Sequence, residues 1–224
     1  MPAINPIAHI QSPYNEKFGI PRQSGLAADV YSTIIFEPEY RHPDALRGIE
    51  QFDYLWLIWQ FSENADHPWS PTVRPPRLGG NTRLGVFATR SSFRPNALGL
   101  SSVRLLSVSS SPVYGSVLHV AGADLMDGTP IFDIKPYIPY SDSHPDARAG
   151  YASQPPRKLT VSCPDHIAST IADAVRNELF QVLAFDPRPS YHDDPGRIYG
   201  FKFYGYNVRF SVDADDILHI VSVS

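Results

Sequence analysis

Cysteine is nearly absent from this chain of 224 residues. The single Cys163 excludes an intramolecular disulfide and a metal site built from several cysteines, and it suits a reducing, cytosolic compartment. Long apolar runs are also absent, because no stretch approaches the roughly 20 residues that span a bilayer. The first residues, MPAINPIAHI, have no basic segment before an apolar stretch. We therefore expect no signal peptide and no membrane segment.

Acidic side chains are absent from the middle of the chain. The segment 67–123 contains no Asp or Glu, although the net charge of the whole chain is −4. Arginine without neighbouring carboxylates suits bidentate recognition of phosphate or carboxylate groups, and we predict a local basic patch rather than a wholly basic surface. The alternative is that these arginines pair in space with acids from 29–66 and 124–146. The six arginines of the segment are Arg74, Arg77, Arg83, Arg90, Arg94 and Arg104.

Several catalytic motifs are missing. No G-x-G-x-x-G follows a predicted strand, and the chain has no G-x-x-x-x-G-K-[ST], H-E-x-x-H or G-x-S-x-G. The eight histidines are scattered along the chain. Rossmann dinucleotide binding, P-loop chemistry and metal hydrolysis therefore have no support, and we expect no metal.

Strand patterns dominate the first two thirds of the chain. The 22 prolines favour strands and ordered loops over a helical bundle. A short helix is expected at 42–52, and the apolar run at 52–61 suits a strand that is buried on both faces. The later strands are spaced without helical patterns between them, which is typical of a β-barrel or sandwich. The other strands are predicted at 3–10, 30–37, 84–89, 99–108, 115–123 and 130–134.

The composition changes near 141–160, which we interpret as a linker. Beyond it, apolar residues at 167, 171, 175, 179, 182 and 183 predict an amphipathic helix within DHIASTIADAVRNELFQVLAFD, and three short strands follow. We therefore predict a mainly β chain with a β-rich domain at 1–150 and a small α+β domain at 151–224.

A cluster of acids follows the arginine-rich segment. Asp127 and Gly128 precede Thr-Pro, which is typical of a corner between strands. Asp133 lies among apolar residues and is expected to face a cleft, where its carboxylate needs a partner such as Lys135 or an arginine.

Three long blocks carry a resemblance to a known family. They are SPYNEKFGIPRQSGL at 12–26, TVRPPRLGGNTRLGVFATRSSFRPNALGLS at 72–101 and LMDGTPIFDIKPYIPYSD at 125–142. Together they resemble the TsaA-like or TrmO family, S-adenosylmethionine-dependent enzymes that N6-methylate threonylcarbamoyladenosine next to the anticodon of tRNA. FDPRPSY at 185–191 and YNVRF at 206–210 resemble the small second domain of the longer bacterial members.

The resemblance implies a compact antiparallel β-barrel and a cytoplasmic homodimer with S-adenosylmethionine near the interface. It also implies tRNA, through its anticodon loop, as the partner. Many members have His where this chain has Ser62, so a side-chain contact there would change. The implied cofactor-binding residues are Ser12, Pro13, Tyr14, Ser62, Glu63, Arg90, Leu100, Leu125, Met126, Asp127 and Gly128.

Chemistry suggests roles for some of these side chains. Arg90 suits the cofactor carboxylate, and Tyr14 suits its sulfonium or adenine. The acceptor nitrogen must lose a proton, and Asp127, Asp133 or Tyr137 are the alternatives for taking it. An extruded base would stack on Phe93 or Tyr137. The candidate substrate-binding residues are Arg74, Arg77, Arg83, Arg94, Asn96 and Lys135.

The sequence leaves three alternatives open. Arg94 is as well explained as a buried arginine that braces a loop. The whole chain is also compatible with a noncatalytic module that binds an adenine nucleotide or an RNA loop, or with a methyltransferase that acts on another acceptor.

Overall fold

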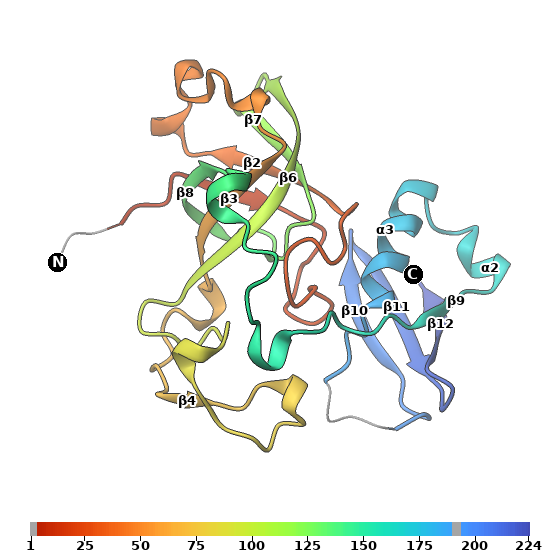
Figure 1. Ribbon diagram of the computed structural model, residues 1–224. Helices are drawn as coiled ribbons and strands as arrows, with labels where there is room; N and C mark the ends of the chain where they lie inside the picture. The colour runs from red at the N-terminus through yellow and green to blue at the C-terminus, as the bar shows by residue number, and fades with distance from the viewer. Residues whose placement is uncertain (1–3, 190–193) are drawn as a thin grey trace.

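The computed structural model describes residues 4–189 and 194–224. Six strands of the N-terminal part pair in one closed cycle, β1-β2-β7-β6-β3-β8, and β8 returns to β1 (Figure 1). All the neighbouring pairs are antiparallel. The strands are β1 (Ala8–Gln11), β2 (Tyr31–Phe36), β3 (Tyr54–Gln60), β6 (Leu98–Ser111), β7 (Gly115–Ala121) and β8 (Pro130–Pro136).

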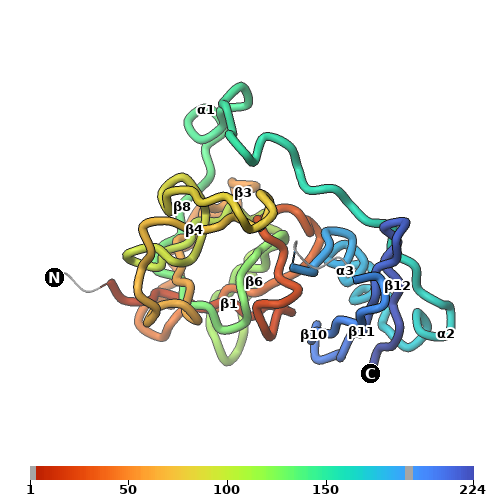
Figure 2. Tube along the Cα trace, turned by 90° about the horizontal axis from the view of Figure 1, so that it is seen from below, coloured from red at the N-terminus to blue at the C-terminus, as the bar shows by residue number. Residues whose placement is uncertain are grey.

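The long connection between β3 and β6 carries a two-stranded sheet, β4 (Thr72–Val73) with β5 (Leu84–Gly85). After β8 comes the short helix α1 (Pro139–Asp142). From there the chain runs along the outside of the molecule to the C-terminal part (Figure 2).

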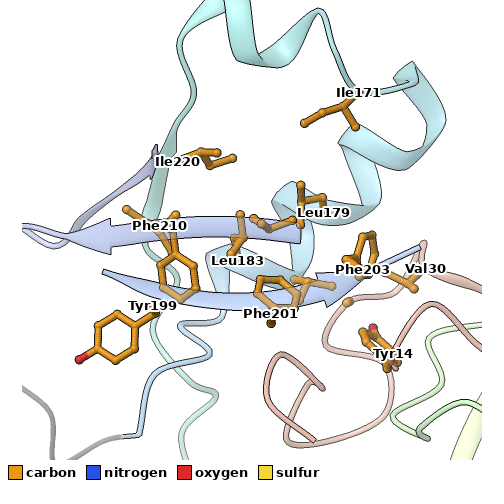
Figure 3. Packing of buried hydrophobic residues seen from close by; sticks show 14 of the residues in the cluster. Tyr14, Val30, Ile171, Leu179, Leu183, Tyr199, Phe201, Phe203, Phe210 and Ile220 are labelled. Atoms are coloured by element: carbon orange, nitrogen blue, oxygen red, sulfur yellow. The ribbon is translucent and has the colours of Figure 1, made fainter. Parts of the chain in front are cut away.

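The C-terminal part has one four-stranded sheet in the order β10-β11-β12-β9, in which only the β12–β9 pair is parallel. Buried residues of α3, including Leu179 and Leu183, pack against the aromatic side chains of the sheet (Figure 3). The elements are β9 (Thr160–Ser162), α2 (Asp165–Ala168), α3 (Asp173–Ala184), β10 (Tyr199–Phe203), β11 (Tyr206–Val212) and β12 (Ile217–Val223).

Two hydrophobic cores stabilise the molecule. Alternate residues of the closed cycle, such as Leu55 and Leu57 on β3, fill the first core. The second core lies between α3 and the four-stranded sheet. Tyr14 and Val30, from the segment between β1 and β2, belong to this second core and lie beside Phe203 (Figure 3). The N-terminal segment 12–30 is therefore packed against the C-terminal sheet.

The prediction of a mainly β chain is confirmed, and β2, β6, β7 and β8 lie where strands were predicted. Three predicted strands are corrected. The strand expected at 3–10 is shorter, because β1 begins at Ala8, and residue 3 lies outside the described residues. β3 buries only one face, because Leu55, Leu57 and Trp59 alternate with more exposed residues. The segment 84–89 contributes only the two-residue β5 before a 3-10 turn at Val86–Ala88. The boundary at residue 150 between two domains stays a prediction.

Both predicted helices are also corrected. The segment 42–52 forms two 3-10 turns, Pro43–Leu46 and Ile49–Gln51, because Gly48 between them adopts a left-handed φ of 88°. The longer helix is divided into α2 and α3. The hydroxyls of Ser169 and Thr170 donate to backbone carbonyls three residues earlier, which favours the end of a helix over its continuation.

Gly99 on β6 is required by close packing. A Cβ atom there would lie 2.3 Å from Cε2 of Trp59, and the indole is nearly buried. We expect Gly99→Ala to lower the free energy of unfolding by about 1–3 kcal/mol, since overpacking a core forces side chains and backbone to shift. Gly85→Ala is the matched control, because no atom lies within 4 Å of the Cβ position there. Urea unfolding of both variants checks this, and equal stabilities would contradict it.

Candidate functional site

A cavity of about 540 Å³ opens beside β3 and the start of β6. Three segments that are far apart in the sequence surround it: the loop 17–23, the end of β3 with the turn after it, and the stretch 89–100. Asp124, Met126 and Thr129 complete its wall. The remaining lining residues include Lys17, Ile20, Pro21, Arg22, Gln23, Trp56, Trp59, Ser62, Glu63, Asn64, Arg90, Arg94 and Leu100.

A hydrogen-bonded chain crosses one wall of this cavity. Nε1 of Trp59 donates to Oγ of Ser101 at 3.0 Å, and this hydroxyl donates to Oδ1 of Asp124 at 2.5 Å. Asp124 also accepts a hydrogen bond from the backbone of Ser24. Burial raises the pKa of the Asp124 carboxyl, although the Ser101 hydrogen bond and the nearby Arg90 charge oppose the rise.

Asp124 was not among the predicted site residues. The sequence signal was present, because an acid that directly follows a strand and an apolar stretch needs a partner. Its partner Ser101, however, lies 23 positions earlier and is not visible from the sequence alone.

Two polar contacts join the loop 12–30 to the opposite wall of the cavity. Arg90 donates to the side-chain carbonyl of Gln23. Nζ of Lys17 donates to Oδ1 of Asn64 at 2.7 Å. All four residues line the cavity, so its shape depends on where the loop 12–30 lies.

The predicted SPY loop and LMDG corner contact each other directly. Oγ of Ser12 donates to the carbonyl of Leu125 at 2.8 Å, and the backbone N–H of Ser12 donates to Oδ1 of Asp127 at 3.0 Å. The backbone N–H of Asp127 donates to the carbonyl of Tyr14 at 2.8 Å. The two blocks therefore form one unit next to the cavity, to which Met126 belongs.

The Tyr14 side chain, predicted to face the cofactor, lies away from the cavity. Its ring is 1% exposed, is not part of the cavity wall and packs against Phe203 with ring centroids 5.9 Å apart. Burial raises the pKa of its hydroxyl, which is therefore neutral. The backbone of Tyr14 is also engaged within the chain, because its N–H donates to Oγ of Ser12 at 3.3 Å and its carbonyl accepts from Asp127.

The cavity brings together part of the predicted cofactor set. Ser62, Glu63, Arg90, Leu100 and Met126 line it. The other predicted members, Ser12, Pro13, Tyr14, Leu125, Asp127 and Gly128, lie outside the cavity wall in the unit formed by the SPY loop and the LMDG corner.

The three predicted proton acceptors do not line the cavity. Asp127 is held by Ser12, and Oδ2 of Asp133 pairs with Nζ of Lys135 at 2.8 Å. The ring of Tyr137 lies 5.6 Å from that of Trp56, which is part of the cavity wall. Tyr137 is therefore next to the cavity rather than inside it.

The predicted substrate-binding residues have different surroundings. Arg74 and Asn96 are exposed. Arg77 donates to the carbonyl of Gln154, and Arg83 donates to Oγ1 of Thr72 at 2.8 Å. Arg94 donates to the carbonyl of Thr89 at 2.8 Å and lies over the Phe87 ring, so it braces the loop, as in the second interpretation of this residue.

Within 4–189 and 194–224, no group of three or more His, Cys, Asp or Glu has the arrangement of a metal site. In the same described ranges, no helix has the length and apolar character to cross a bilayer.

A buried acid joins the C-terminal helix to the N-terminal strands. Oε2 of Glu178 on α3 accepts hydrogen bonds from the backbone N–H of Tyr31 at 3.2 Å and from the hydroxyl of Tyr204 at 2.8 Å. Burial raises the pKa of this carboxyl above 4.5, although both hydrogen bonds oppose the rise.

This raised pKa predicts a pH dependence of stability. Above the unfolded pKa of 4.5, the unfolded chain releases the proton while the folded chain keeps it until its own higher pKa is reached. The contribution of Glu178 to the free energy of unfolding is therefore fully present below pH 4.5. It is lost as the pH rises through the pKa of the folded state. Relative to Glu178→Gln, we expect wild-type stability to fall over this window in urea unfolding. Parallel curves would contradict the assignment.

The closed cycle of strands and the cavity beside it define a β protein outside the Rossmann class. The family model described as tRNA-methyltransferase O N-terminal domain matches residues 9–143, and the TrmO C-terminal domain model matches residues 156–224. The chain belongs to the TrmO family.

Curated relatives and solved structures agree over nearly the whole chain. The tRNA (adenine(37)-N6)-methyltransferase of Escherichia coli K12 is 43% identical over 215 residues, which are 92% of this chain and 91% of the relative. A putative S-adenosylmethionine-dependent methyltransferase, RcsF, of Pseudomonas aeruginosa is 38% identical over 99% of this chain and 97% of its own length. The crystal structure of TrmO from Pseudomonas aeruginosa matches with a TM-score of 0.82 and 34% identity, covering 100% of this chain and 98% of that one.

Proposed function

We propose that this protein methylates N6 of threonylcarbamoyladenosine next to the anticodon of tRNA. The coarser part follows from the family and its named relatives: the protein is an S-adenosylmethionine-dependent enzyme that methylates N6 of adenine 37 in tRNA. The main observation in support of the site is the cavity. Arg90, Asp124 and aromatic side chains line it together, and two of the three segments around it belong to the sequence blocks of the family.

The cavity suits S-adenosylmethionine in size and chemistry. Its volume of about 540 Å³ is within the range of small-molecule and cofactor sites. Arg90 can pair with the ligand carboxylate, and Asp124 can accept from an amine or hydroxyl. Trp56 offers aromatic surface to a cation or an adenine.

The bound cofactor would supply an electrophilic methyl group on a sulfonium centre. The residues of the chain hold and align the reactants, and such positioning contributes several kcal/mol to catalysis. Lys17 and Gln23 keep the loop 12–30 across the cavity from Asn64 and Arg90, which fixes the width of the site.

Proton removal from the acceptor nitrogen needs a base near the cavity. Among the three predicted acceptors, Tyr137 is supported by its ring contact with Trp56. Lys135 lies opposite Trp56 in the β3–β8 register, two residues before Tyr137. Asp133 and Asp127 stay alternatives with existing partners.

The arginine-rich connection would bind the anticodon loop. Arg74 extends from an exposed position, and Arg77 and Arg83 use only part of their donors within the chain. Phe93, which is 41% exposed, offers a face for a flipped base. Asn96 and Lys135 remain candidates for contacts with the base, and Arg94 supports the loop that presents Phe93.

The same proposal covers the assembly. We infer that the closed cycle is a compact barrel, that the chain divides into domains at 1–150 and 151–224, and that two copies associate in the cytoplasm. Leu100 lines the cavity, is 57% exposed and pairs with Ile58 on β3. An exposed apolar side chain at this position favours burial against the second copy. Light scattering during gel filtration tests the dimer, and a monomeric mass would contradict it.

Nucleoside mass spectrometry tests the reaction. The protein is incubated with S-adenosylmethionine and threonine-specific tRNA that carries threonylcarbamoyladenosine but lacks this methylation. A gain of one methyl on that nucleoside, with none on the same tRNA lacking the threonylcarbamoyl group, supports the proposal. Methylation of both tRNAs would leave only the coarser reaction. Cofactor binding without transfer would favour another acceptor, and no cofactor binding would favour a noncatalytic module.

A further inference from the structure

The loop 12–24 has two sides with different neighbours. On one side, Lys17, Ile20 and Gln23 line the cavity. On the other side, the loop lies against β10 and β11, and Ile20 packs against the C-terminal core while also lining the cavity. The C-terminal sheet and the cavity are therefore separated by a single layer of chain.

Phe18 is the main side chain on the side of the sheet. Its ring is stacked with Tyr199 at 6.3 Å and with Phe210 at 6.4 Å between centroids, and it meets Phe201 edge to face at 6.2 Å. Figure 3 shows these three partners side by side on the sheet. The segment that lines the cavity is thus anchored by an aromatic ring inserted into the aromatic surface of β10 and β11.

The backbone of the loop fits the same surface closely. Gly19 has a φ of 96°, and a Cβ there would lie 2.4 Å from Cδ2 of Phe201. The backbone N–H of Tyr204 donates to the carbonyl of Pro13 at 3.2 Å. The backbone N–H of Lys202 donates to Oε1 of Glu16 at 2.9 Å.

The hairpin tip also reaches the end of the segment. Tyr204 and Gly205 form the two-residue turn between β10 and β11, with φ values of 48° and 83°. The Tyr204 hydroxyl donates to Glu178 and lies 3.3 Å from the carbonyl of Tyr31. One hairpin therefore contacts the segment 12–31 at its start and at its end.

We propose that the C-terminal sheet positions the loop 12–24 for cofactor binding, with Phe18 as the positioning residue. A loop of this length without helix or strand loses conformational entropy when it is ordered. If the sheet orders the loop before the ligand binds, the entropy loss is not subtracted from the free energy of binding, and the affinity for the ligand is higher. The inference rests on the proposed assignment of the cavity to the cofactor.

The test compares three variants of the full chain. Phe18→Ala removes the anchor, Phe18→Leu keeps an apolar side chain there, and Ile220→Ala removes core volume on β12, away from the loop in Figure 3. The dissociation constant for S-adenosylmethionine is measured by calorimetry, and stability by urea unfolding. We expect about tenfold weaker binding for Phe18→Ala, which is about 1.4 kcal/mol, and much smaller changes for Phe18→Leu and Ile220→Ala.

Two outcomes would overturn the proposal: unchanged affinity in Phe18→Ala, or an equal loss in Ile220→Ala at similar destabilisation. If Phe18→Ala does not fold, Glu16→Ala decides the matter, because Glu16 is exposed and its carboxylate ties the loop to β10. We then expect about threefold weaker binding, with Glu16→Gln near wild type, and no change would contradict the role of the sheet.

A parallel titration separates this proposal from the assignment of the cavity. If Arg90→Ala also binds as wild type, the cavity is not the cofactor site. If Arg90→Ala binds weakly and Phe18→Ala binds normally, only the role of the C-terminal sheet fails.

Discussion

Arg90→Ala is expected to weaken S-adenosylmethionine binding by about 10- to 100-fold and to lower methyl transfer to tRNA in parallel at subsaturating cofactor. Arg90 is an exposed cation on the cavity wall, and Nη1 of its guanidinium donates to a neutral side chain, Gln23. It therefore has donors left for a carboxylate, and a hydrogen bond to a charged group contributes about 1.5–3 kcal/mol. Calorimetry measures the affinity, and single-turnover transfer measures the reaction.

The effect has a second source within the chain. The Arg90 charge is one of the influences that hold down the pKa of the buried Asp124 carboxyl. Without Arg90, the Asp124 carboxylate is less stable in its charged form, and the cavity loses part of its polarity. Arg90→Lys keeps the charge but not the planar fork, so we expect an intermediate affinity.

Arg104→Ala is the matched control. Arg104 lies on β6 outside the cavity wall and pairs with Asp29 at 3.3 Å in a partly exposed position. Exposed pairs contribute little to stability, and we expect cofactor affinity near that of wild type. Equal losses of cofactor affinity in both variants, or no loss in Arg90→Ala, would show that Arg90 does not contact the cofactor.

The sequence was sufficient where local pattern decides the structure. Alternating or β-branched runs predicted β2, β6, β7 and β8, because strands with one buried face leave a period of two in the sequence. The blocks that line the cavity were also visible, since they carry the family's motifs. The lack of acids between 67 and 123 drew attention to six arginines, and the resemblance to the family selected Arg90 among them.

The two helix predictions were wrong for local reasons that the pattern of apolar residues does not show. The turns at Pro43–Leu46 and Ile49–Gln51 have helix-like composition, but Gly48 takes a left-handed conformation between them. Amphipathic spacing continued through the break between α2 and α3. There, the hydroxyl of Thr170 donates to the backbone carbonyl of Ile167. This side-chain hydrogen bond competes with the backbone hydrogen bonds that would continue the helix.

The predicted site was incomplete because some of its contacts join residues that are far apart in the sequence. Tyr14 was assigned to the cofactor because it belongs to the SPY motif of the family, yet its ring packs on Phe203, almost 190 positions later. Phe18 and Glu178 also have partners far along the chain, because Phe18 stacks on Phe210 and Glu178 accepts from the backbone of Tyr31. No single-sequence pattern encodes such pairings, whereas the fold brings them together.

Asp124→Asn is expected to weaken cofactor binding by about tenfold at pH 8 and to remove most of its pH dependence. Asn keeps the shape, but its amide offers one acceptor where the carboxylate offers two, and it carries no charge. Because burial raises the pKa of Asp124, wild-type affinity should fall as the pH is lowered through that raised value, when the carboxyl becomes protonated. Asp124→Asn has no such proton, so its affinity should vary less with pH.

Calorimetric titrations of S-adenosylmethionine from pH 8 down to pH 5 make this comparison. Asp53→Asn, an exposed acid before β3, controls for general changes in charge and should follow the wild-type curve. If Asp124→Asn binds as tightly as wild type at pH 8, the carboxylate only braces Ser101 and Ser24 and does not contact the ligand. If affinity is lost but the pH dependence remains, another group that lines the cavity carries the titration. The pair of results therefore distinguishes a ligand contact by Asp124 from a structural role in the chain Trp59–Ser101–Asp124.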